Sequence, residues 1–177
     1  MLIALTGEKL SGKGTASDYF ANEKDAKKFR FSQVLFDILE RLHKDTSRKN
    51  LVDLGIALRK VYGDDVLAQV LVEDIKKDNS KIQIVDGMRY LAEYELLKKL
   101  PNFKLVYVSV PMEVRFKRMK DRSEKADESA MTFDEFKQRE TDKTEIEILE
   151  LAKLADYTIT NRGSLEDYYN QLQAITE

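Results

Sequence analysis

The stretch Gly7-Glu8-Lys9-Leu10-Ser11-Gly12-Lys13-Gly14-Thr15 has the residue types and the spacing needed to bind a polyphosphate. Gly7 and Gly12 can adopt backbone angles closed to other residues, so successive N–H groups can point inward around an anion. Lys13 is placed to reach the β- and γ-phosphates, and the Thr15 hydroxyl is placed to ligate Mg²⁺. We therefore expect Mg²⁺ and ATP to be bound here, with seven residues contacting ATP: Gly7, Leu10, Ser11, Gly12, Lys13, Gly14 and Thr15.

The segments on either side of this loop support the same interpretation. The apolar run Leu2-Ile3-Ala4-Leu5 predicts a strand before it, and an amphipathic pattern from about Lys13 to Asn22 predicts a helix after it. A strand, a glycine-bounded loop and a helix N-terminus are the context that this motif requires, and the helix dipole favours an anion at the same place. The alternative is a glycine-rich turn that carries a lysine by chance. We interpret the stretch as a P-loop.

A second chemical group follows the run Lys81-Ile82-Gln83-Ile84-Val85-Asp86, which predicts a buried strand ending in a carboxylate. Open α/β sheets place their ligand crevice at the carboxyl ends of the strands. Asp86 is therefore expected to position the metal, directly or through a bound water, together with Thr15. The alternative is an aspartate that only caps the next turn.

Three arginines share one face of the helix predicted from about Met112 to Asp121 and its end. Arg115, Arg118 and Arg122 are separated by three, four and seven positions, so their guanidinium groups can converge on one anion. Phosphoryl transfer needs such groups around the migrating phosphate. The alternative is a solvated basic face, since lysines lie on the same helix.

Strand and helix patterns alternate along the whole chain, which predicts a parallel sheet between layers of helices. We expect an α/β fold of one domain over residues 1–177: a three-layer P-loop NTPase fold with a five-stranded parallel sheet, a helical acceptor-binding region at about 32–80 and a short lid at about 122–140. The expected strands are 2–5, 28–31, 81–86, 103–110 and 157–160. The expected helices with both ends predicted are 13–22, 50–62, 91–100 and 112–121. Four more helices are expected: one capped by Ser32, one capped by Asp64 that runs to about 77, one that begins at 132 and one that begins at 164. The charged segment 123–130 has no apolar period and predicts a loop.

Composition excludes several classes of protein. A net charge of -2 over 177 residues gives no electrostatic case for a dedicated nucleic-acid binder. The absence of cysteine excludes disulfides and a thiolate zinc site. No apolar run has the length of a membrane span. We expect a cytoplasmic monomer or homodimer that binds neither membranes nor nucleic acid.

Two motifs resemble those of known kinases. The sequence G-K-G-T at Gly12 to Thr15 resembles nucleoside monophosphate kinases, and its continuation to Phe20 looks like the deoxynucleoside monophosphate kinase branch. Adenylate kinases usually carry a proline and an extra glycine where this chain has Lys9 and Leu10, so a relative of adenylate kinase is expected rather than adenylate kinase itself. Asp86-Gly87-Met88-Arg89-Tyr90 resembles the D-x-R-(F/Y) signature of deoxynucleoside monophosphate kinases, which implies that Arg89 binds the phosphate of the acceptor.

The resemblance extends to the arginine helix and the end of the chain. Val110 to Val114 and Arg118 to Arg122 resemble a helix of adenylate kinase, where the first matching arginine stacks on the ATP base and the second contacts phosphates. Asn161 and Gly163 resemble the loop that touches the adenine. The resemblance implies five catalytic residues, Lys13, Arg89, Arg118, Arg122 and the lid residue Arg139, and adds Arg118 and Asn161 to the ATP site.

The acceptor is expected to bind between the second strand and Asp86, the span that folds over the monophosphate in this family. A phosphate dianion must be held by cationic groups. The candidates are Ser32, Arg41, Arg48 and Arg59, together with Arg89.

These observations predict an ATP-dependent kinase that moves the γ-phosphoryl group to a nucleoside or deoxynucleoside monophosphate, giving ADP and a nucleoside diphosphate. One alternative is dephospho-CoA kinase, but Phe29-Arg30-Phe31-Ser32-Gln33 offers no aspartate where that enzyme keeps its general base. The other alternative is a nucleotide-binding ATPase or switch, which would hydrolyse ATP slowly without depending on an acceptor. The expected partners are ATP and a small nucleotide.

Overall fold

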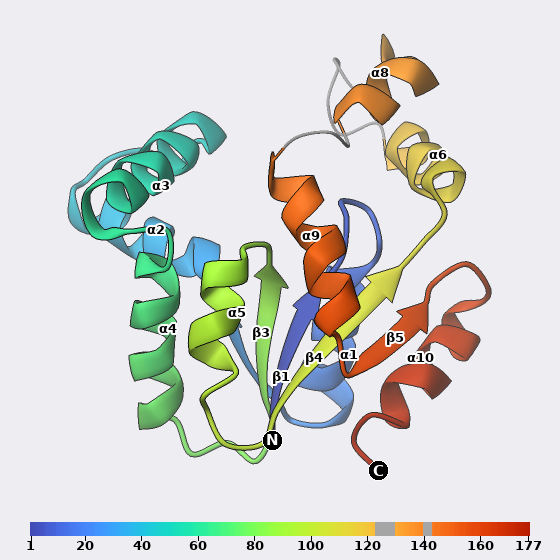
Figure 1. The fold of residues 1–177 in the computed structure, drawn as a ribbon, viewed down its shortest axis with the longest axis horizontal. Coiled ribbons are helices and arrows are strands. Elements are labelled where there is room, and N and C mark those ends of the chain that lie inside the picture. The colour runs from blue at the N-terminus through green and yellow to red at the C-terminus, as the bar shows by residue number, and fades with distance from the viewer. Residues whose placement is uncertain (123–129, 140–142) are drawn as a thin grey trace.

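The protein is built on a parallel sheet whose strands run in the order β2-β3-β1-β4-β5 (Figure 1). The computed structural model describes residues 1–122, 130–139 and 143–177, without the side chains of 139 and 143–145. Within that part of the chain the sheet has five strands, and every pair of neighbours is parallel. The strands are β1 (Leu2–Thr6), β2 (Lys27–Arg30), β3 (Gln83–Met88), β4 (Phe103–Ser109) and β5 (Tyr157–Thr160). The predicted fold class is confirmed.

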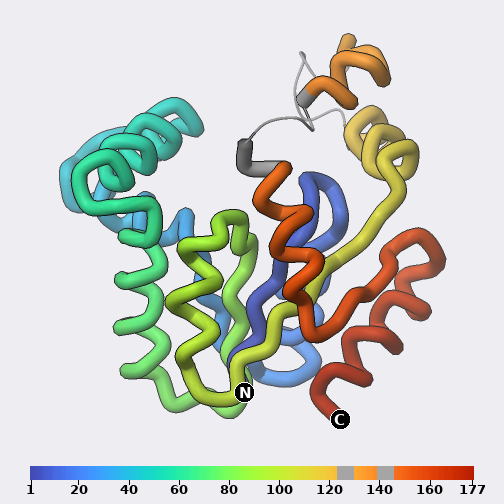
Figure 2. Tube along the Cα trace, viewed as in Figure 1, coloured from blue at the N-terminus to red at the C-terminus, as the bar shows by residue number. Residues whose placement is uncertain are grey.

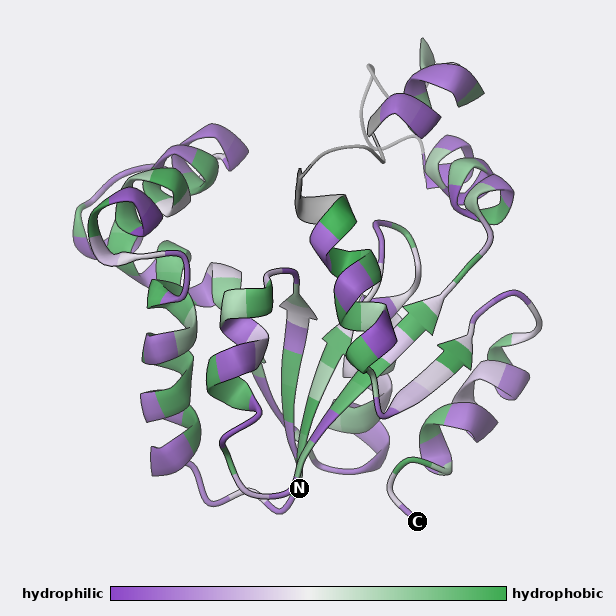
Figure 3. Ribbon diagram, in the orientation of Figure 1, coloured by the Kyte–Doolittle hydropathy of each residue, from purple (hydrophilic) through white to green (hydrophobic). Residues whose placement is uncertain are grey.

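Side chains alternate between the two faces of the sheet and bury two separate cores. Leu2 and Ala4 face helices α4 (Val66–Lys77), α5 (Leu91–Leu97) and α9 (Lys143–Leu154). Ile3 and Leu5 face helices α1 (Lys13–Glu23) and α10 (Leu165–Gln173). The central strands are apolar and the outer surface of α4 is hydrophilic (Figure 3). Burial on both faces is what a parallel sheet with crossover helices requires.

The remaining helices lie beyond the carboxyl ends of the strands (Figures 1 and 2). Helices α2 (Phe31–Arg41) and α3 (Arg48–Tyr62) form one group, and α6 (Met112–Arg122) and α8 (Phe133–Arg139) form the other. A small apolar cluster of Met119, Met131 and Phe136 joins α6 to α8. No helix in the described part of the chain is long and apolar enough to cross a membrane.

Several helix boundaries differ from those predicted. Helix α2 begins at Phe31 with Arg30 as its N-cap, so the prediction that Ser32 is the cap was wrong. Phe31 is 7% exposed and packs in the core, which favours a helix that starts two residues earlier than a Ser32 cap would allow. The N-cap of α4 is Asp65 rather than Asp64, and α5 ends at Leu97 rather than Leu100. The predicted capping box of Thr132 and Glu135 is confirmed.

Strand β3 continues two residues beyond its predicted end, so Asp86 lies within the strand. Its register against β1 shifts there: Leu5 pairs with Asp86, but Thr6 pairs with Met88. Gly87 is the extra residue, and its φ of 85° is one that glycine adopts readily. The bulge keeps Met88 in the ladder, where its carbonyl accepts a hydrogen bond of 2.9 Å from the Thr6 hydroxyl.

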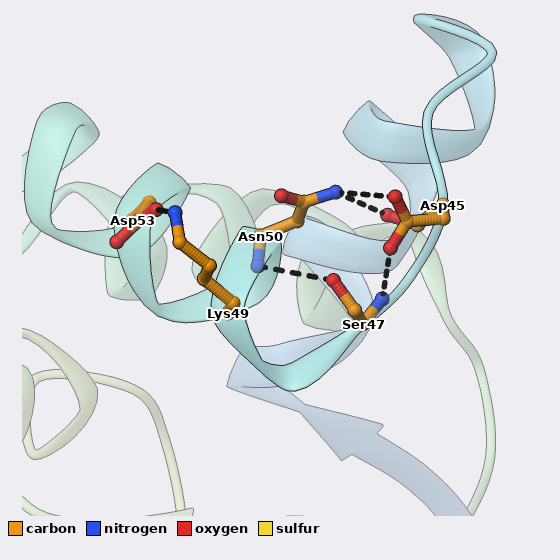
Figure 4. A network of polar contacts seen from close by, with 5 residues as sticks. All are labelled: Asp45, Ser47, Lys49, Asn50 and Asp53. Atoms are coloured by element: carbon orange, nitrogen blue, oxygen red, sulfur yellow. Dashed lines mark hydrogen bonds and ion pairs between the residues drawn. The ribbon is translucent and has the colours of Figure 1, made fainter.

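The turn into α3 is fixed by polar contacts (Figure 4). The Ser47 hydroxyl accepts a hydrogen bond from the Asn50 amide, which caps the helix. The Asp45 carboxylate accepts from the Ser47 N–H at 3.0 Å and from the Asn50 side chain at 2.9 Å. Lys49 and Asp53 form an i,i+4 pair on the exposed face. Because this network orders the first turn of α3, it also fixes the position of Arg48, which follows Ser47 and is the first residue of the helix.

Leu151 tests the packing of α9 on the sheet. It is fully buried, whereas Leu149 on the same helix is 50% exposed. Leu151→Ala should lower the free energy of unfolding by about 2 to 5 kcal/mol because it leaves a cavity between helix and sheet. Leu149→Ala should change it by less than about 0.5 kcal/mol. Urea denaturation of both variants is the measurement, and similar losses would contradict this placement of α9.

Candidate active site

The P-loop follows β1, and both of its predicted glycines are required by the structure. Gly7 has φ 144° and Gly12 has φ 101°. A Cβ atom on Gly7 would lie 2.6 Å from the backbone oxygen of Val108, and one on Gly12 would lie 2.1 Å from Nδ2 of Asn161. Both contacts are closer than atoms can approach, so a side chain at Gly7 would displace backbone and one at Gly12 would displace the side chain of Asn161.

Lys13 begins helix α1 and its ammonium group lies within the loop. Nζ donates to the carbonyl oxygen of Gly7 at 2.5 Å and to that of Glu8 at 2.8 Å. The Glu8 side chain is only 7% exposed, and its carboxylate accepts a hydrogen bond of 2.8 Å from the Tyr107 hydroxyl. The lysine therefore has the position at a helix N-terminus where phosphate binding is favoured.

Arg118 and Asn161 donate hydrogen bonds to backbone carbonyls of the P-loop. The Arg118 guanidinium donates to the Leu10 carbonyl at 3.0 Å and to the Asn161 carbonyl at 2.7 Å. Asn161 donates from its side chain to the Ser11 carbonyl at 2.8 Å. In this arrangement Arg118 contacts the P-loop itself, in addition to lining a cavity beside it.

Tyr168, on α10, was not anticipated from the sequence and completes this set of contacts. Its hydroxyl donates to the Gly12 carbonyl at 3.1 Å. Burial raises the pKa of Tyr168, so the hydroxyl keeps its proton and remains a donor. With Arg118 and Asn161, it occupies the carbonyls of Leu10, Ser11 and Gly12, which fixes the path of the loop backbone.

Two cavities meet at the P-loop. The larger has a volume of about 720 Å³ and extends toward α2, α3 and the end of β3. The smaller, about 460 Å³, extends toward α6 and the turn after β5, where Asn161 and Gly163 line it. The residues that line both cavities are Leu10, Gly12, Thr15 and Arg122.

The larger cavity brings together most of the residues predicted for the acceptor and the metal. Ser32, Arg59 and Arg89 line it, as do Thr15 and Asp86. The predicted candidate Arg48 also lines it, together with Arg30, which was not predicted. Arg30 Nε lies 3.8 Å from Asp86 Oδ2. The cavity is therefore cationic. Its apolar walls are contributed by Leu10 of the loop and by Phe31, Leu35, Leu51, Val52, Ile56 and Leu67.

Three predicted arginines are not among the described lining residues of either cavity. Arg41 is exposed at the end of α2. Arg115 is only 3% exposed, donates to the Val110 carbonyl at 3.3 Å, and has its guanidinium carbon 5.7 Å from the centre of the Phe136 ring. The predicted convergence of Arg115 with Arg118 and Arg122 is therefore not observed, because the apolar contact of α6 with α8 buries Arg115. The side chain of Arg139, and residues 123–129 and 140 of the predicted lid, lie outside the described residues.

Glu93 is the main site residue that the sequence reasoning missed. It is 1% exposed on α5 and lines the larger cavity. Its carboxylate accepts from the amides of Arg89 at 2.9 Å and Tyr90 at 3.2 Å, and lies 3.5 Å from an Arg59 nitrogen. Burial raises the pKa of Glu93 to about 7. Its place at the third position of a helix beginning just after Arg89 was the signal available in the sequence.

Comparison with known sequences finds relatives that match almost the whole chain. A UPF0200 protein of Saccharolobus islandicus is 31% identical over 178 residues, covering 99% of this chain and 92% of that protein. A UPF0200 protein of Sulfurisphaera tokodaii is 29% identical over 175 residues, covering 98% of this chain and 94% of that protein. No protein-family model matches the chain.

Solved kinase structures share its fold. Shikimate kinase from Bacteroides thetaiotaomicron superposes with a TM-score of 0.63 at 18% identity, covering 99% of this chain and 96% of that structure. Dephospho-CoA kinase from Campylobacter jejuni superposes with a TM-score of 0.61 at 19% identity, covering 99% and 94%. At these identities the likeness shows the fold.

The close approach of Gly12 to Asn161 predicts that a side chain at position 12 destabilises the protein even when no ligand is bound. Gly12→Ala should destabilise the protein by about 1 to 3 kcal/mol, because alanine is strained at this φ and its Cβ would meet Asn161. Gly14→Ala is the matched control, since nothing lies within 4 Å of the added Cβ and the position is helical. Urea denaturation without nucleotide measures both, and equal stability of the two variants would contradict the contact.

Glu93 predicts a dependence of stability on pH. The folded protein retains the Glu93 proton up to about pH 7, whereas an ordinary glutamate loses it near pH 4.5. Between these values the folded state binds more protons, so the contribution of Glu93 to stability falls as the pH rises. From pH 5 to pH 8 the wild type should lose about 2 to 3 kcal/mol more than Glu93→Gln. Denaturation at both pH values tests this, with exposed Glu95→Gln as the control, which should behave as the wild type.

Proposed function

The chain belongs to the UPF0200 protein family, and we propose an activity for it from its P-loop and the two cavities beside that loop. We propose that it is an ATP-dependent kinase that acts on a nucleoside or deoxynucleoside monophosphate. It would transfer the γ-phosphoryl group to the phosphate of the acceptor, giving ADP and a nucleoside diphosphate. The fold that it shares with P-loop kinases supports a phosphotransferase.

One observation carries this proposal: the P-loop and Arg122 lie between two cavities and line both. A donor in the smaller cavity and an acceptor in the larger would meet at Gly12, Thr15 and Arg122. Phosphoryl transfer requires the attacking and leaving oxygens to lie roughly in line across the migrating group, with cationic groups beside it. Two cavities that share a phosphate-binding loop support such an arrangement.

The donor would occupy the smaller cavity. Arg118 and Asn161 line it, as the resemblance to adenylate kinase implies for the nucleoside of ATP. Its triphosphate would extend across the N-terminus of α1, where Lys13 now donates to two loop carbonyls. In the reaction Lys13 would donate to the β- and γ-phosphate oxygens and stabilise charge as it moves to the leaving group.

The acceptor would occupy the larger cavity, with its phosphate beside Arg59 and Arg89 and its base against the apolar wall. A monophosphate fits this chemistry because its attacking oxygen is already ionised and needs no general base. The two carboxylates among the described lining residues have other tasks: Asp86 lies beside Arg30, and Glu93 is engaged by two backbone amides and Arg59.

Thr15 and Asp86 suit a magnesium ion. A hydroxyl and one carboxylate lining the same cavity are the kind of donor set that Mg²⁺ uses when the nucleotide phosphates supply further ligands. When bound there, Mg²⁺ would neutralise charge on the β- and γ-phosphate oxygens. The chain's own contribution is to hold the phosphates with the loop and Lys13.

Dephospho-CoA kinase, whose fold is shared, is the runner-up. A hydroxyl acceptor would need a general base, and the residues at the end of β2 are Arg30 and Phe31. An ATPase or switch is the third possibility, although the second cavity and its arginines would then have no substrate to bind. The predicted lid at about 122–140, including Arg139, remains a prediction.

The proposal is tested by incubating the protein with Mg²⁺ and ATP and, separately, each common ribo- and deoxyribonucleoside monophosphate and dephospho-CoA, while ADP release is measured. At least one monophosphate should accelerate release. Lys13→Ala should lower that rate by about a hundredfold to a thousandfold, the range for loss of one group that stabilises transferring charge. The exposed neighbour Lys9→Ala is the matched control. Release without dependence on any acceptor would favour the ATPase, and activity only with dephospho-CoA would favour the runner-up.

A further inference from the structure

Glu93 joins two walls of the larger cavity that come from distant parts of the chain. One oxygen, Oε2, accepts from the backbone amides of Arg89 and Tyr90, immediately after β3. The other, Oε1, lies 3.5 Å from an Arg59 nitrogen on α3. Glu93 is 1% exposed, and its carboxylate contacts three nitrogen donors. Burial and these contacts together restrict the side chain to one position.

Arg59 is held in a single arrangement by these surroundings. Its guanidinium carbon lies 4.7 Å from the centre of the Tyr90 ring, a cation–π contact. Another of its nitrogens donates to the Gly55 carbonyl at 3.4 Å, within the same helix. The remaining nitrogen, Nε, is buried and has no hydrogen-bond partner among the described residues.

Arg59 lines the larger cavity, and its side chain is 19% exposed. Although Nε is buried, the exposed part of the guanidinium can therefore meet an oxygen of a bound anion. Arg89, whose amide is held by the same carboxylate, lines the cavity as well. The two arginines therefore reach the cavity from two segments of the chain that Glu93 holds together.

We propose that Glu93 is a positioning residue for the phosphate of the acceptor: it holds Arg59 of α3 and the Arg89 segment in the relative arrangement that binds the anion. This inference rests on the proposed function. An arginine side chain has many rotamers, and ordering it on ligand binding costs affinity. Glu93 and Tyr90 order Arg59 beforehand, so the phosphate meets a guanidinium already in place.

Glu93→Gln separates this role from the capping of α5. Glutamine has nearly the same shape, but it has one acceptor oxygen. It cannot serve both the two backbone amides and Arg59. At pH 8, where Glu93 is ionised, the KM for the acceptor should rise about tenfold, equivalent to about 1.4 kcal/mol, while the KM for ATP changes less than about twofold. Glu95→Gln, an exposed carboxylate on the same helix, should match the wild type.

A double-mutant cycle identifies Arg59 as the group through which Glu93 acts. Arg59→Gln should raise the acceptor KM at least as much, and adding Glu93→Gln to it should have little further effect. Lys60→Gln, an exposed neighbour on α3, is the control. The inference is overturned if Glu93→Gln leaves the acceptor KM unchanged, raises both KM values equally, or has its full effect without Arg59.

A binding measurement distinguishes failure of this inference from failure of the proposed function. Inorganic phosphate is titrated by calorimetry into protein saturated with Mg²⁺ and ADP. Weaker phosphate binding by Glu93→Gln than by Glu95→Gln supports the positioning role, even if no monophosphate proves to be an acceptor. Equal affinity of the two variants, or no phosphate binding by the wild type, contradicts it whatever the acceptor is.

Discussion

The structure depends on holding the carbonyl groups of the P-loop from outside. Arg118, Asn161 and Tyr168 are each distant from the loop in sequence, yet each donates a hydrogen bond to one of its carbonyls. A peptide group directs its N–H opposite to its carbonyl, so these contacts fix the direction of the peptide groups that follow Leu10, Ser11 and Gly12. The shape of the loop is therefore coupled to helix α6, the turn after β5 and helix α10.

The fold was predictable because its signals are local and repeat along the chain. Alternating apolar strands and amphipathic helices, together with the glycine spacing of the P-loop, indicate a parallel sheet with a phosphate site at its carboxyl edge. The end of β3 was less predictable, because the bulge at Gly87 arises from pairing with β1 rather than from the sequence of β3.

The site was predictable in part, and the differences come from packing between distant segments. Helical spacing places Arg115 and Arg118 on one face, but it does not reveal that α8 covers Arg115 while Arg118 reaches the loop. In the sequence, Glu93 looks like an ordinary glutamate in the first turn of a helix. Its contact with Arg59, which is distant in sequence, is visible only in the folded structure. Arg41 and Arg59 are equivalent as basic residues on predicted helices, yet only Arg59 lines the cavity in the described structure.

The charge of the larger cavity has a consequence for the rate at which ligands arrive. Its described lining holds six cationic side chains, Lys13, Arg30, Arg48, Arg59, Arg89 and Arg122, against Asp86 and Glu93, although the chain as a whole carries a net charge of -2. A positive concavity on a negative protein focuses the field and draws anions toward one entrance while the rest of the surface repels them. Such steering acts over roughly 10 Å at moderate ionic strength and weakens as salt is added. Capture of a phosphorylated ligand would therefore slow in concentrated salt even where the contacts inside the cavity are unaffected.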